Sequence, residues 1–196
     1  MRQQVVLVRH GETEWTLNGR HTGRSDIPLT AHGREQAQDL VRRLQDWHFT
    51  MVMTSPLQRA VETCRLAGFS AGSRIENDLA EWDYGDYDGQ TSAQIRANNP
   101  EWDLWRDGGP GGETPDQVGR RADRVIEKVL AVDGGVLLVS HGHLLRVLAA
   151  RWIEDAAGEG RRLAMSPAAI SILGYEHQDR VIHLWNDTGR PEPRDS

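Results

Sequence analysis

Two segments of the sequence share one pattern, an apolar strand that runs directly into a polar residue, a histidine and a glycine. Residues 5–8 (VVLV) lead into Arg9, His10 and Gly11, and residues 135–140 (GVLLVS) lead into His141 and Gly142. Short apolar, β-branched runs are typical of strands buried on both faces of a parallel sheet. A packed core excludes arginine and generally histidine as well, so these strand ends call for an explanation other than packing.

The rest of the chain alternates between predicted helices and strands, with no linker or internal repeat that would divide it. Thr30 is expected to cap a helix, Ser55-Pro56 to start a second one that stops near Gly68, and Thr114-Pro115 to start a third. Helices are predicted at residues 31–47, 56–68, 92–98, 114–133 and 144–153, and further strands at 49–55, 168–173 and 180–185. This order predicts an α/β fold, a three-layer α/β/α sandwich with a mostly parallel central sheet, in one domain of residues 1–196 whose tail, 188–196, is flexible.

Parallel sheets bind ligands beyond the carboxyl ends of their strands. The helix after strand 49–55 carries Arg59 in its first turn, so if the three strands are neighbours, Arg9, His10, Arg59 and His141 meet at one edge. We expect the glycines to let the backbone approach a ligand, and the helix starts to supply free N–H groups. Each residue alone fits an ordinary structural role, but the set together predicts a phosphate pocket.

Composition limits the possible partners and the compartment. The net charge of −6, with 38% apolar and 27% charged residues, argues against a protein that coats nucleic acid or an acidic membrane. No apolar run is long enough for a membrane span or for the core of a signal peptide. The single cysteine, Cys64, cannot form an internal disulfide, which favours a cytoplasmic location.

The motifs, taken in order, resemble those of the histidine phosphatase superfamily, the phosphoglycerate mutase-like group. The resemblance runs from about Val5 to Trp185 and rests on RHGET at residues 9–13, Leu29-Thr30, Ser55-Pro56 with Arg59-Ala60, Glu81, and Ser140-His141-Gly142. It implies phosphoryl transfer through a phosphohistidine, with no metal and no cofactor. The stretches EWDYGDYDG, WRDGGPGGET and HGHLLR resemble two phosphatase subgroups, the actinobacterial acid phosphatases and the fungal sedoheptulose bisphosphatases, which favours sugar phosphates or similar small metabolites as substrates.

The resemblance also implies a role for each matching residue. His10 is the expected nucleophile, and Glu81 the group that protonates the leaving oxygen and then takes a proton from water. Arg9, Arg59, His141 and Gly142 are expected to bind the phosphoryl oxygens. The negative charge of a phosphate raises the pKa of a carboxyl beside it, so we expect the activity to be highest at mildly acidic pH.

A second set of residues is expected to contact the rest of the substrate. Thr22 and Gly23 match the loop that touches substrate in this family. Thr16 stands where the mutases have an asparagine, so that contact is altered or lost. His143 is expected either to contact the substrate or to cap the helix that follows it.

Other functions stay open at this stage. A cofactor-dependent phosphoglycerate mutase is the first alternative, although Arg106 is the only cation between Trp102 and Gly112 and no arginine pair occurs there. A metal-dependent hydrolase that uses HGH and Glu81, and an inactive phosphometabolite-binding module, are the others. The expected partner is a small phosphate ester, and a homodimer is possible.

Overall fold

The computed structural model describes residues 3–189, so most of the predicted flexible tail lies outside the described residues. The strands are β1 (Gln4–Arg9), β2 (Phe49–Thr54), β3 (Arg74–Ile75), β4 (Gly135–Ser140), β5 (Ile170–Glu176) and β6 (Asp179–Asp187). The α-helices are α1 (Glu14–Leu17), α2 (Ala31–Leu44), α3 (Gln58–Leu66), α4 (Ser92–Asn98), α5 (Leu104–Asp107), α6 (Pro115–Leu130) and α7 (Gly142–Trp152). Short 3₁₀ helices span Asn77–Leu79, Gly85–Tyr87 and Ala157–Arg162.

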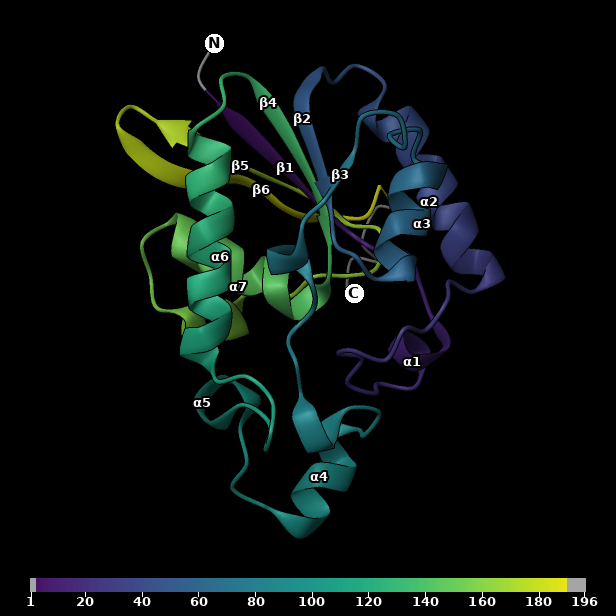
Figure 1. The fold of residues 1–196 in the computed structure, drawn as a ribbon, viewed down its shortest axis with the longest axis vertical. Coiled ribbons are helices and arrows are strands. Elements are labelled where there is room, and N and C mark those ends of the chain that lie inside the picture. Colours follow the sequence, from purple (N-terminus) through teal and green to yellow (C-terminus); the bar gives the residue numbers. More distant parts are fainter. Residues whose placement is uncertain (1–2, 190–196) are drawn as a thin grey trace, which may run out of the picture.

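The six strands form one sheet in the order β3-β2-β4-β1-β5-β6. β1, β2, β3 and β4 run parallel, while β5 and β6 form an antiparallel hairpin at one edge. Helices α2 and α3 lie on one side of the sheet and α6 and α7 on the other (Figure 1). The predicted α/β/α sandwich with a mostly parallel sheet is therefore confirmed. Among the described residues, no helix is both long and apolar enough to cross a membrane.

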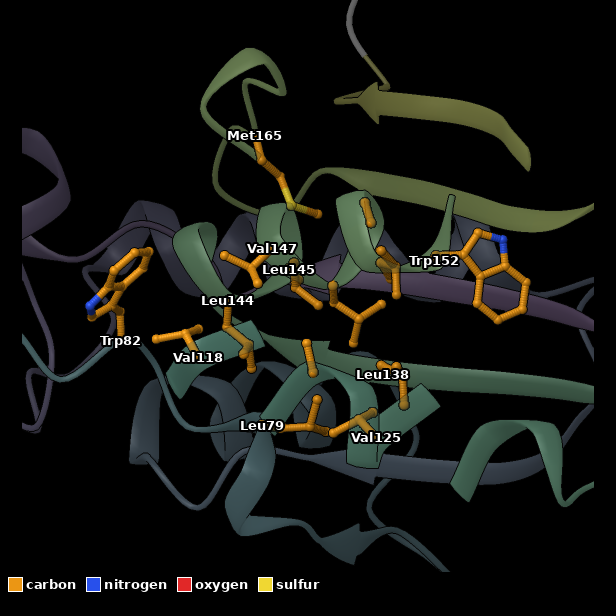
Figure 2. Packing of buried hydrophobic residues seen from close by; sticks show 14 of the residues in the cluster. Leu79, Trp82, Val118, Val125, Leu138, Leu144, Leu145, Val147, Trp152 and Met165 are labelled. Atoms are coloured by element: carbon orange, nitrogen blue, oxygen red, sulfur yellow. The ribbon is translucent and has the colours of Figure 1, made fainter. Parts of the chain in front are cut away.

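The alternation of side chains along the central strands builds two cores, one on each face of the sheet. Leu7 and Leu138 pack with the apolar side chains of α6 and α7, whereas Val8 and Leu137 pack with those of α2 and α3. Figure 2 shows the first of these clusters, from Trp82 at one end to Trp152 at the other. Because both faces are covered, the strands read as continuous apolar runs in the sequence.

The predicted helix starts are confirmed at two places and wrong at one. Thr30 caps α2 by accepting a hydrogen bond from Gly33 N, and Thr114 caps α6 with Pro115 as its first residue. Ser55-Pro56, in contrast, does not begin α3. The helix starts at Gln58, after a turn in which Ser55 Oγ accepts a hydrogen bond from Leu57 N. The strand β3 and the helices α1 and α5, of two to four residues each, are too short to give a periodic signal.

The loop after β1 passes very close to helix α2. A Cβ atom on Gly11 would lie 2.3 Å from the carbonyl oxygen of Gly33, and one on Gly33 would lie 2.1 Å from the carbonyl oxygen of Glu12. The expectation that Gly11 allows a ligand to approach is therefore wrong. Gly11 allows the backbone to approach α2, which fixes the path of the chain just after His10.

This contact predicts a severe effect for Gly33→Ala. Because the new methyl group would meet backbone atoms that cannot rotate away, we expect the free energy of unfolding to fall by about 2 kcal/mol or more. Gln38→Ala, at an exposed position of the same helix, should change it by less than about 0.5 kcal/mol. Urea unfolding followed by circular dichroism measures both, and equal stability of the two variants would contradict the close approach.

Candidate active site

Two histidine rings lie side by side at the carboxyl edge of the sheet. In the register of β1 and β4, Arg9 lies opposite Ser140, and His10 N donates a hydrogen bond to Ser140 O. The residues that follow, His10 and His141, therefore emerge next to each other. Their ring centroids are 5.1 Å apart and the rings are tilted by 59°. The expected convergence of the two strand ends is present.

The surroundings of His10 leave one of its nitrogen atoms unprotonated. Its Nδ1 lies 2.7 Å from the carbonyl oxygen of Gly11, and because a carbonyl can only accept, Nδ1 must carry the proton. Burial, followed by the positive charges of Arg59 and Arg9, holds the pKa of His10 well below its usual value. The neutral ring thus has a free lone pair on Nε2, as a nucleophile requires.

His141 is held by two protein groups. Arg59 Nε donates to its Nδ1 over 3.1 Å, so its other nitrogen, Nε2, carries the proton and donates to Ser55 Oγ over 2.7 Å. Burial and the charge of Arg59 hold the pKa of His141 well below its usual value. His141 is therefore neutral, and both of its nitrogen atoms are occupied.

Arg59 is fully buried directly behind His141. Besides His141, its guanidinium donates to the carbonyl oxygens of Thr22, Gly23 and Ser25. Its donors are thus directed at backbone oxygens, and Arg59 does not line the pocket described next. The structure brings Arg59 to the site, but behind the two rings.

The pocket beside His10 has a volume of about 190 Å³. Of the residues predicted to bind the phosphoryl group, Arg9 and Gly142 line it together with His10 and Glu81. Arg9 Nε is buried and has no hydrogen-bond partner among the described residues, while Arg9 Nη1 donates to the carbonyl oxygen of Met165. A buried donor without a partner is costly, and because Arg9 lines the pocket, an anion bound there would lie beside its positive charge. The absent side chain of Gly142 makes room for Arg9, because a Cβ there would lie 3.3 Å from the guanidinium carbon.

Glu81 links the pocket to the start of helix α7. Its Oε1 accepts hydrogen bonds from the backbone N–H groups of Trp82 and Leu144, and its Oε2 accepts one from His143 N. The side chain is only 7% exposed yet lines the pocket. The prediction that the helix starts offer free N–H groups to a ligand is therefore wrong at these two positions of α7, because a carboxylate of the protein already occupies them.

The residues predicted to contact the rest of the substrate divide into two groups. Thr16, Thr22 and His143 line the pocket, although the Thr16 hydroxyl also takes part in the capping box of α1 with Thr13. Gly23 does not line it. A Cβ at Gly23 would lie 2.8 Å from the carbonyl oxygen of Trp82, so this glycine serves a close backbone contact.

The expectation that His143 might cap helix α7 is not met. It is the second residue of the helix, and its side chain instead lies 2.7 Å from the hydroxyl of Tyr84. The first helical turn is satisfied by Glu81, so no histidine cap is needed there.

Sequence reasoning missed several residues that line the pocket, above all Arg146. This arginine lies 4.4 Å over the ring of Trp105 and donates from Nε and Nη2 to the carbonyl oxygens of Gly160 and Arg161. Its position one helical turn after Gly142 could have revealed it, because residues four apart share a helix face. His21, Tyr84, Trp15, Gly19, Arg20 and Met165 complete the lining. Trp15 lies in the four-residue helix α1 and the others lie in loops, so their approach to the site leaves no periodic signal.

The structure does not supply a ligand set for the metal-dependent alternative. Within residues 3–189, no three His, Cys, Asp or Glu side chains are arranged so that they could hold a metal ion. Nδ1 of His10 and both ring nitrogens of His141 already form hydrogen bonds with protein groups.

Known proteins share this fold and these motifs. An acid phosphatase of Mycobacterium tuberculosis is 41% identical over 194 residues, which cover 97% of this chain and 95% of that protein. A sedoheptulose 1,7-bisphosphatase of Saccharomyces cerevisiae is 34% identical over 181 residues, covering 76% of this chain and 67% of the yeast protein. The solved structure of an open reading frame product of M. tuberculosis matches with a TM-score of 0.92 and 40% identity, covering 97% of this chain and 100% of that one.

A protein-family model also matches most of the chain. The model of the histidine phosphatase superfamily (branch 1) matches residues 5–188. This range includes both strand–His–Gly segments, Arg59 and Glu81, on which the resemblance in the sequence was based. The chain belongs to the histidine phosphatase superfamily.

Proposed function

We propose that this protein is a metal-independent phosphomonoesterase that hydrolyses small phosphorylated metabolites, most of all sugar phosphates or bisphosphates, through a phosphohistidine on His10. The observation that carries the proposal is the free Nε2 of a neutral, buried His10 beside Arg9, whose buried Nε lacks a partner. Such a pair suits attack on phosphorus next to a cation that binds the phosphoryl oxygens. The acid phosphatase and bisphosphatase named above, as relatives, support the choice of substrate class.

In the proposed reaction, His10 Nε2 attacks phosphorus while Arg9 and the Gly142 segment bind the phosphoryl oxygens. Glu81, on the wall of the same pocket, protonates the leaving oxygen and then removes a proton from the water that cleaves the phosphohistidine. Direct contact of Arg59 and His141 with the phosphoryl group would require them to exchange their present partners. With its present partners, Arg59 acts electrostatically, because its charge favours the neutral form of both imidazoles.

Phosphoglycerate mutase is the second candidate, and the structure adds an observation in its favour. In the sequence, the segment between Trp102 and Gly112 has only one cation, Arg106, which speaks against a mutase. Arg106 indeed pairs with Asp107 at the surface, but Arg20 and Arg146 also line the pocket and could face a second anionic group. Incubation with 3-phosphoglycerate and catalytic 2,3-bisphosphoglycerate distinguishes the two activities, since a phosphatase releases inorganic phosphate and a mutase forms 2-phosphoglycerate.

The nucleophile is tested by His10→Ala. We expect kcat/KM for p-nitrophenyl phosphate to fall by about 1,000-fold or more, because no other group replaces the attacking nitrogen. Rapid acid-free quenching of the wild-type protein with ³²P-labelled substrate should trap a labelled histidine that the variant lacks. His48→Ala, at an exposed histidine, is the matched control and should keep both activity and label. A wild-type protein without turnover would favour the inactive binding module, and a variant with full turnover would exclude His10 as the nucleophile.

The lowered pKa of His10 predicts how activity depends on pH. A depressed pKa keeps Nε2 unprotonated at pH values where an ordinary histidine is charged, so activity is retained below about pH 6.5 and is lost only as the pH falls through the lower pKa. We expect kcat/KM to fall by less than about twofold between pH 7 and 5.5, while the mildly acidic preference expected of a carboxyl general acid would appear as a rise.

The pH profile needs a control for stability. The unfolded chain takes up protons on its histidines below about pH 6.5, whereas the buried rings of His10, His141 and His143 resist protonation, so the folded state loses stability in acid. Circular dichroism at each pH separates this loss from titration of the nucleophile. An acidic limb centred near pH 6.5 in a fully folded protein would contradict the shielding of His10.

A further inference from the structure

The hydroxyl of Tyr84 contacts the ring of His143 at the wall of the pocket. Tyr84 Oη lies 2.7 Å from His143 Nδ1, and Tyr84 is only 1% exposed. Among the described residues, His143 Nδ1 is the sole hydrogen-bond partner of this hydroxyl. Neither residue has a part in the attack on phosphorus, so the contact calls for a separate explanation.

The direction of this hydrogen bond follows from burial. If His143 Nδ1 donated to Tyr84, the buried hydroxyl proton would have no acceptor, which is unfavourable. The Tyr84 hydroxyl therefore donates and His143 Nδ1 accepts. Burial, followed by the negative charge of Glu81, raises the pKa of Tyr84 well above its usual value, so the phenol keeps its proton.

With Nδ1 as the acceptor, the proton of the neutral His143 ring is on Nε2. Burial and the charges of Arg146, His21 and Arg9 hold the pKa of His143 well below its usual value, so the ring stays neutral. No described residue pairs with His143 Nε2, yet it is not among the buried polar atoms that lack a partner, so it is open to solvent. Since His143 lines the pocket, this N–H is available to a ligand there.

The glycine-rich segment 108–112 holds Tyr84 in position by backbone contacts. A Cβ on Gly109 would lie 2.0 Å from the carbonyl oxygen of Tyr84, and one on Gly112 would lie 2.8 Å from its carbonyl carbon. Hydrogen bonds from Asp86 N to Pro110 O and from Glu113 N to Asp83 O fasten the two segments on either side of Tyr84. The motifs EWDYGDYDG and WRDGGPGGET thus form one unit, and Tyr84 is one of its side chains that line the pocket.

We propose that Tyr84 is a positioning residue that fixes His143 as the Nε2–H tautomer, and that His143 selects substrates by donating this hydrogen bond to a hydroxyl oxygen of the leaving group. The proposal rests on the phosphatase function proposed above. The neutral N–H of His143 suits an uncharged oxygen, whereas the guanidinium of the nearby Arg146 suits an anionic one. The two residues would therefore bind different parts of a substrate. A polyhydroxylated leaving group, such as a sugar, fits this wall of the pocket.

Substitutions of His143 test the selectivity. Glucose 6-phosphate and cyclohexylmethyl phosphate both have a primary leaving oxygen on a six-membered ring, but only the first has hydroxyl groups. In His143→Asn, an oxygen can accept from Tyr84 but the pocket loses its donor, and we expect the ratio of kcat/KM for the two esters to fall by about 2- to 12-fold. In His143→Gln, whose amide nitrogen can reach the position of Nε2, the ratio should stay within about twofold of wild type. An unchanged ratio in the asparagine variant, or equal losses in both variants, would overturn the proposal.

The tautomer is tested without any turnover. Long-range ¹H–¹⁵N spectra of the wild-type protein should show His143 with an unprotonated Nδ1 and a protonated Nε2. Tyr84→Phe should shift protons toward Nδ1. Tyr87→Phe is the matched control, because Tyr87 lies in the same loop and its hydroxyl has no hydrogen-bond partner among residues 3–189. A protonated Nδ1 in the wild type, or no difference between the two variants, would overturn the positioning role. A wild-type protein that hydrolyses neither these esters nor p-nitrophenyl phosphate would refute the phosphatase function, whereas the spectra would still decide the role of Tyr84.

Discussion

In the centre of the sheet, β1 pairs with β4 so that Arg9 lies opposite Ser140, and His10 N donates to Ser140 O. If β1 slipped by one residue along β4, every side chain of β1 would turn to the other face of the sheet. Here Val5 to Val8 and Val136 to Val139 are buried on both sides, so a slip would disrupt two cores at once. The apolar packing of the sheet therefore sets the distance between the His10 and His141 rings, far more firmly than any contact between the rings themselves.

The protonation of the His10 and His141 rings depends on the charge of Arg59, which is buried beside them. Arg59 carries its charge into the interior, where carbonyl oxygens and His141 satisfy its donors and no carboxylate of residues 3–189 forms a direct ion pair with it. Glu81, Asp26 and Asp88 act on this charge only from a distance, and together with burial the charge disfavours protonation of both imidazoles. A carboxylate in place of these carbonyls would satisfy the guanidinium equally well but would remove this effect. The backbone oxygens that accept from Arg59 thus help to keep the His10 ring neutral.

The sequence predicted the features that depend on local pattern and failed for those that depend on long-range contacts. Strands, layers and the meeting of the two histidines follow from apolar runs and from the rule for parallel sheets, and they are present. Three other expectations failed because a protein group that is distant in the sequence, or a local turn, occupies the place expected for a ligand or a helix start. Gly33 lies against Gly11, Glu81 occupies the first N–H groups of α7, and the turn at Ser55 delays the start of α3. Arg146 was overlooked as a site residue because its neighbours in the pocket are distant in the sequence, and Tyr84 was not assigned to the site because a loop aromatic fits a packing role equally well.

The two sides of the pocket are built by different means. Arg9, His10 and His141 are placed by strands in the core of the sheet, and Glu81 is placed by the N–H groups of α7. Tyr84 is placed by backbone contacts with the 108–112 segment, which lies beyond the sheet with α4 and α5 (Figure 1). Changes in such a loop are tolerated far better than changes in a two-sided core. The loop-built side of the pocket can therefore vary while the side built by the sheet is retained, so that one sheet edge can accommodate different substrates.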